Sequence, residues 1–125
     1  MVVSTVTEEP ETPDIDGRPI DIEVVSDSTD TALLMRQGTS TRVEIDSATT
    51  RIIGHLNLLL AEELGADADP VVQEQFSKAY TLLELTQRPT ATTPAFGAFS
   101  YLREVATVTR RLLWIYAQGI GADVA

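Results

Sequence analysis

The chain has 125 residues, the size of a single domain with one hydrophobic core, and 43% of them are hydrophobic, as in folded globular proteins. It contains no cysteine, which excludes disulfides, thiolate nucleophiles and cysteine-ligated metal sites. The formal net charge of −10 argues against nucleic-acid binding, because phosphate recognition needs a cationic surface.

The negative charge is concentrated at the start of the chain. Residues 1–30 hold nine acids and one base, whereas residues 31–125 hold ten acids and eight bases. The longest apolar run, Leu58 to Ala61, is far shorter than a membrane span, and no secretory signal precedes the domain. We therefore expect a cytoplasmic protein that binds neither membrane nor nucleic acid.

Residues 1–19 contain three prolines and many acids without a helical apolar period, which predicts a flexible acidic N-terminal lead. A β-hairpin is the alternative, because Asp16 and Gly17 suit a two-residue turn and Ile20, Ile22 and Val24 alternate with acids. Residues 20–125 are expected to form the folded domain.

The first two helices are predicted from their ends. Asp21 can cap a helix that continues to Gln37, with Gly38 as its left-handed C-terminal cap, although residues 26–31 have poor helix propensity. A capping box at Thr41 and Glu44 opens a second helix that runs to Leu64 before Gly65. Its core stripe comprises Ile45, Ala48, Ile52, Leu56, Leu59 and Leu60.

Two further helices follow the same signals. Asp69 and Pro70 open a third helix that ends near Arg88, and Thr93 and Pro94 open a fourth that runs to about Gln118. The predicted inner faces are Val72, Phe76, Ala79, Tyr80 and Leu83, and then Phe96, Phe99, Leu102, Ala106, Leu113 and Tyr116. Short connections between amphipathic helices predict an all-α, up-and-down bundle of about four helices.

The only histidine, His55, is the first candidate for chemistry. It can act as an acid or base with Glu62, beside Arg51, in a pocket between the second and fourth helices. The alternative is a boundary histidine that hydrogen-bonds a neighbouring helix. Gly54, a costly residue in mid-helix, indicates either close helix packing or room for a ligand.

The fourth helix carries Arg103, Thr107, Arg110 and Trp114 on one stripe. This pattern suits binding of an anion or a planar ring, and it also suits a solvated face. The predicted ligand-binding residues are Arg51, Arg110, Trp114 and Tyr116. No phosphate loop, dinucleotide fingerprint or zinc motif is present, so neither a cofactor nor a metal is expected.

The segment from Arg51 to Glu62 resembles the Gly-His-x-x-Leu-Leu motif of a family of small actinobacterial proteins of unknown function. Members are sometimes labelled natural-product biosynthesis proteins, and the last helix, Phe99 to Gly119, is similar to that family's C-terminal segment. The resemblance implies that Gly54, His55 and Glu62 belong to a family motif. Ala61 stands where the family has proline, which puts any helix kink there in doubt.

Three functions remain open on the sequence. The first is a small-molecule-binding or accessory protein of natural-product metabolism, with a pocket near His55. The second is a cofactor-free enzyme that cyclises or isomerises an intermediate with His55 and Glu62 as its acid–base pair. The third is a homodimer or adaptor that associates through exposed apolar residues such as Ile53, Leu85 and Trp114.

Overall fold

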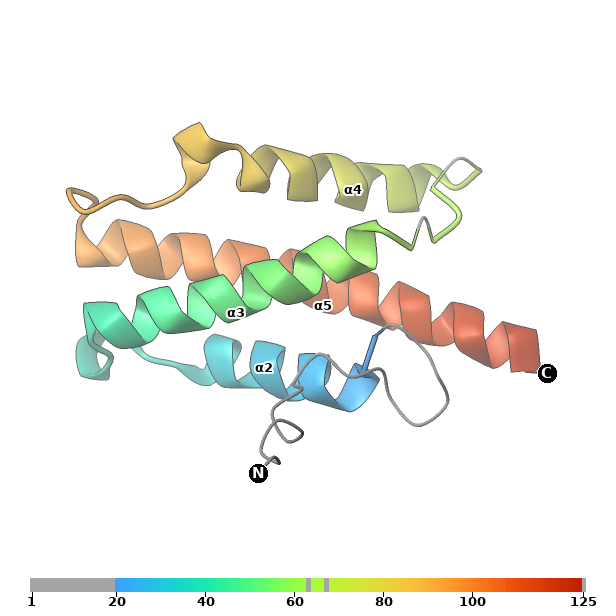
Figure 1. Ribbon diagram of the computed structural model, residues 1–125, viewed down its shortest axis with the longest axis horizontal. Coiled ribbons are helices and arrows are strands. Elements are labelled where there is room, and N and C mark those ends of the chain that lie inside the picture. Colours follow the sequence, from blue (N-terminus) through green and yellow to red (C-terminus); the bar gives the residue numbers. More distant parts are fainter. Residues whose placement is uncertain (1–19, 63, 67, 125) are drawn as a thin grey trace, which may run out of the picture.

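The structure, a computed structural model, describes residues 20–124 apart from 63 and 67, and side chains as far as residue 119. Its helices are α2 (Ile22–Leu34), α3 (Arg42–Leu60), α4 (Pro70–Leu83) and α5 (Ala95–Val124), with 3₁₀ turns η1 (Gln37–Thr39) and η2 (Leu85–Gln87). Consecutive α-helices run in opposite directions (Figure 1). The predicted all-α bundle is confirmed, and no strand occurs in the described residues. The predicted lead, residues 1–19, lies outside them.

Helix α5 is the central element of the bundle. It packs against α2, α3 and α4, while α2 and α4 make no contact with each other within the described chain. In Figure 1, α3 crosses in front of α5, and α2 and α4 flank it on opposite sides. None of these helices combines the length and apolar character that a membrane span requires.

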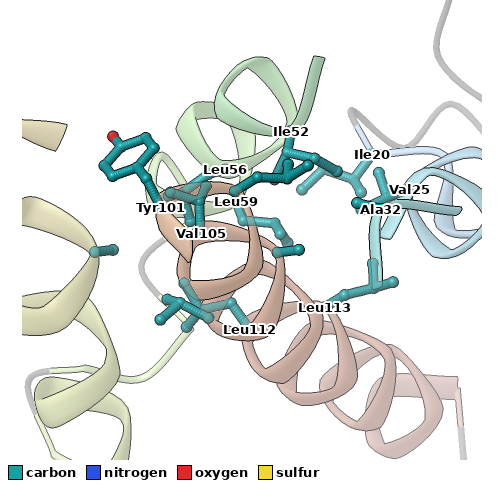
Figure 2. Packing of buried hydrophobic residues seen from close by; sticks show 14 of the residues in the cluster. Ile20, Val25, Ala32, Ile52, Leu56, Leu59, Tyr101, Val105, Leu112 and Leu113 are labelled. Atoms are coloured by element: carbon teal, nitrogen blue, oxygen red, sulfur yellow. The ribbon is translucent and has the colours of Figure 1, made fainter. Parts of the chain in front are cut away.

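The core forms where α2 and α3 meet α5. Leu56 and Leu59 of α3 lie near Val105 of α5, and Ile52 lies toward Ile20 beside α2 (Figure 2). Burial of each such large aliphatic side chain stabilises the fold by about 1.5–3 kcal/mol. This burial also explains why residues 26–31 are helical despite their poor propensity, because Thr29 and Ala32 are fully buried in the same interface.

Three predicted helix starts are confirmed in detail. The Asp21 carboxylate accepts a hydrogen bond from the backbone N–H of Val24 at 3.2 Å. Thr41 and Glu44 form a reciprocal capping box at the start of α3. Asp69 accepts from the N–H of Val71 at 2.9 Å, with Pro70 in the first turn of α4. Each cap satisfies a backbone donor that the helix itself leaves unpaired.

The predicted helix ends are less accurate. Helix α2 ends at Leu34 because Met35 turns to extended backbone, so Gly38 lies within η1 and is not the predicted cap. Helix α3 ends at Leu60, four residues early, and Leu64 and Gly65 then adopt positive φ angles. Helix α4 stops at Leu83 and is followed by η2, whereas α5 continues past Gln118 to Val124.

Further corrections concern individual faces. Ile22 and Val24 lie in α2, which excludes the hairpin over those residues. Tyr80 and Phe96 were expected inside, but 55% and 66% of their surfaces are exposed. Gly54 does not serve close helix packing, because an added Cβ would meet no atom within 4 Å.

Candidate functional site

His55 faces α2 rather than α5. Its Nε2 lies 3.1 Å from the Oγ of Ser28, across the boundary between α3 and α2. Burial, and secondly the positive charge of Arg51, lower the pKa of the His55 imidazole below its ordinary value of 6.5. The ring is therefore neutral at pH 7 and can either accept or donate in this contact. The geometry is that of a boundary histidine joining two helices.

Of the other two residues predicted beside His55, Arg51 lies close enough for its charge to act on the imidazole, whereas Glu62 does not contact it. Arg51 is exposed one turn earlier on α3. Glu62 lies beyond the end of α3, and no hydrogen bond or ion pair joins it to His55 in the described chain. The arrangement therefore does not place a carboxylate where it could orient the imidazole as catalytic dyads do.

The predicted ligand-binding residues of α5 point in different directions. Arg110 faces α2, where its Nη2 forms a 2.9 Å ion pair with the Oδ1 of Asp30. Trp114 is 64% exposed on the outer side of α5, and Tyr116 is buried in the core. The predicted site residues are thus spread over the α2–α3 boundary, the outer face of α5 and the core.

A hollow that contains none of these predicted site residues lies between α4 and α5. It has a volume of about 580 Å³. Its lining comprises Glu74, Ser77, Lys78, Thr81 and Leu82 of α4, with Arg103, Glu104, Thr107, Val108 and Arg111 of α5. We call this hollow the α4–α5 groove. The sequence pattern does not reveal it as a site, although two of its lining residues, Arg103 and Thr107, belong to the polar stripe of the predicted fourth helix.

Packing of α4 on α5 fixes the width of the groove. The buried Tyr101 of α5 donates its hydroxyl to the backbone oxygen of Leu82 at 2.5 Å, near the C-terminal end of α4. Burial raises the pKa of the Tyr101 hydroxyl above its ordinary value of 10.0, so the group stays protonated and keeps donating. Val72 and Ala79 are buried on the inner face of α4, which holds the two helices together along their length.

Charged side chains form the rim of the groove, three of them cationic and two anionic. Lys78 lies 3.7 Å from the Glu74 carboxylate. Arg103 donates to the backbone oxygen of Leu33 at 3.0 Å and sits 6.0 Å from the centre of the Phe99 ring. The rim is therefore slightly positive on a chain whose net charge is −10.

A second hollow of about 420 Å³ lies between α3 and the loop that leads to α5. Two cations line it. The Arg42 guanidinium donates to the backbone oxygens of Thr93 at 2.6 Å and Thr90 at 2.7 Å, and to Asp46 at 2.9 Å. The Arg88 Nε donates to the backbone oxygen of Leu83 at 3.0 Å. Because both arginines already use donors to hold the backbone in place, this hollow is the weaker candidate for a ligand site.

Comparison with protein-family models, curated proteins and solved structures finds no match to this chain. Among the described residues, no group of three His, Asp or Glu side chains is placed to hold a metal ion. The site must therefore be interpreted from its own geometry.

Proposed function

We propose that this protein binds an elongated small molecule in the α4–α5 groove. The observation that carries the proposal is the groove itself: its volume of about 580 Å³ lies within the roughly 300–1,000 Å³ typical of ligand sites. Spaces between the helices of a bundle are common ligand sites. A role in natural-product metabolism, which the sequence resemblance implies, stays a prediction.

The length of the groove suits a drug-sized molecule. Its α5 wall runs from Arg103 to Arg111, and its α4 wall from Glu74 to Leu82. At the rise of an α-helix, each wall is about 12 Å long. A drug-sized ligand fits this length.

The chemistry of the walls is amphipathic. Leu82 and Val108 supply apolar surface, while Ser77, Thr81 and Thr107 bring hydroxyl groups to the same hollow. The Thr107 hydroxyl donates to the backbone oxygen of Arg103 at 2.8 Å, which leaves its lone pairs free to accept from a ligand. A ligand with an apolar body and a few polar groups could pack on the apolar side chains and hydrogen-bond the hydroxyl groups of these walls.

Fluorescence of N-phenylnaphthylamine, a neutral apolar dye, tests the proposal. We expect saturable binding to the wild-type protein and at least about a tenfold weaker affinity when Thr107→Phe fills the groove. Thr31→Phe, on the exposed side of α2, is the matched control and should bind as the wild type does. Equal binding by the wild type and Thr107→Phe would refute the α4–α5 groove as the site.

Self-association is a second candidate function, favoured by the exposure of Leu85, Phe96 and Trp114 at 80%, 66% and 64%. Ile53, also expected to be exposed, is half-buried in the wall of the second hollow. Native mass spectrometry of the protein from its host separates the candidates. A retained mass of a few hundred daltons supports ligand binding, and a ligand-free dimer supports self-association.

A further inference from the structure

We infer that the ligand of the α4–α5 groove is an amphipathic monoanion whose negative charge is held by Arg111. The inference rests on the proposed function and deepens it by naming the class of ligand. Guanidinium groups bind carboxylates and sulfonates through two parallel hydrogen bonds, which gives orientation as well as affinity.

Arg111 is the one cation of the rim that has no partner among the described residues. Lys78 has its partner in Glu74, and Arg103 is fixed by the backbone oxygen of Leu33. Arg111 is exposed, lines the groove and makes no hydrogen bond or ion pair within the described part of the chain. Its full hydrogen-bonding capacity is therefore available to a ligand.

The other rim charges compensate each other. Glu104 lies on the same wall as Arg111, seven residues earlier, which corresponds to about 10.5 Å along α5, and it directly follows the cationic Arg103. On α4, the Glu74 carboxylate lies 3.7 Å from Lys78. One positive charge of the rim, that of Arg111, is therefore left without a compensating carboxylate among the described residues, and the groove favours a ligand with a single anionic group.

Trp114 does not line the groove but lies one helical turn beyond Arg111 on α5. It follows Arg111 by three residues, a spacing that makes two side chains neighbours on a helix surface. Most of its ring is exposed. An aromatic or aliphatic ligand body could pack on this ring while its anion engages Arg111, and that packing would give Trp114 the ligand contact predicted for it.

Two dyes with the same ring system, anilinonaphthalene sulfonate and the neutral N-phenylnaphthylamine, measure how much the negative charge of a ligand contributes to its affinity. We expect the wild type to bind the sulfonate at least about tenfold more tightly than the neutral dye. Arg111→Gln should abolish that preference, because it removes the positive charge that only the sulfonate dye engages. Octanoate should displace the sulfonate dye at concentrations where octanol does not, which extends the result to carboxylates.

Arg36→Gln is the matched control, because Arg36 is an exposed arginine in the connection after α2 and lies outside the groove. It should keep the wild-type preference, and near-ultraviolet circular dichroism should verify that each variant is folded. Equal affinity of the wild type for both dyes, or an unaltered preference in Arg111→Gln, overturns the monoanion inference alone. Failure of the neutral dye to bind the wild type at all overturns the proposed function.

Discussion

The imidazole of His55 and the hydroxyl of Ser28 join α3 to α2 across 3.1 Å, in a contact between residues 27 positions apart. A neutral ring can accept from the Ser28 hydroxyl or donate to it, and burial together with Arg51 favours the neutral form by lowering the pKa of His55. Because the folded chain holds this half-buried histidine in its neutral form, the stability of the fold depends on pH.

The free energy of unfolding should fall as the pH drops below the ordinary histidine pKa of about 6.5. Below that value the unfolded chain takes up a proton that the folded chain, with its lower pKa, does not, so protonation favours unfolding. The loss continues until the pH passes the folded pKa. Thermal melting of the wild type and His55→Gln from about pH 7.5 to pH 5 measures it, because glutamine cannot titrate. Parallel pH profiles for the two proteins would contradict the assignment.

Gly54→Ala should stabilise the protein by about 1 kcal/mol, because alanine is the better helix former and loses less backbone entropy. The added Cβ meets nothing within 4 Å on the exposed side of α3. Urea denaturation should show a higher midpoint with an unchanged slope. A lower midpoint would mean that this position of α3 packs more closely than described.

Arg42→Lys should destabilise the protein by about 1–3 kcal/mol, because a lysine cannot reproduce the hydrogen bonds to both loop carbonyls. Those bonds hold Thr90 and Thr93 against the first turn of α3. Asp46→Ala is the control: it removes only an exposed pair on the same helix and should cost about 0.5 kcal/mol or less. Equal losses for the two variants in urea denaturation would show that the loop contacts contribute nothing measurable.

Gln75→Leu should stabilise the protein by about 1 kcal/mol or more. Gln75 is buried on α4, and its Oε1 has no hydrogen-bond partner within the described chain. Replacing an unsatisfied amide by an apolar group of similar size removes a desolvation penalty and adds apolar burial. Gln73→Leu, exposed on the same helix, should leave the unfolding midpoint nearly unchanged.

Local signals in the sequence predict much of this fold. The caps at Asp21, Thr41 and Asp69 depend on residues a few positions apart, and each forms as expected. The α3 stripe is confirmed for Ile52 and its buried neighbours for the same reason. Helix ends were predicted less well because tertiary packing decides where a helix stops: Gly119 lies inside α5, although glycine often ends helices.

Local sequence signals cannot predict the α4–α5 groove. Its walls come from segments about 30 residues apart, and only their packing brings Thr81 near Arg103. The contact between His55 and Ser28 could not be predicted either. The sequence shows the spacing of His55 and Glu62 along the chain, but it does not show which residue of another helix lies opposite His55. In a small helical bundle, the periodicity of apolar residues predicts which face of each helix is buried, but it does not predict which helices pack against each other.

The central position of α5 has a consequence for how the chain folds as it is made. Every other helix packs on α5, and α2 and α4 share no contact in the described residues. During synthesis α2, α3 and α4 therefore leave the ribosome before their common partner. The core of this protein can close only once α5 has also emerged, and a chain that stalls before α5 exposes Ile52, Leu56 and Leu59 to aggregation or proteolysis.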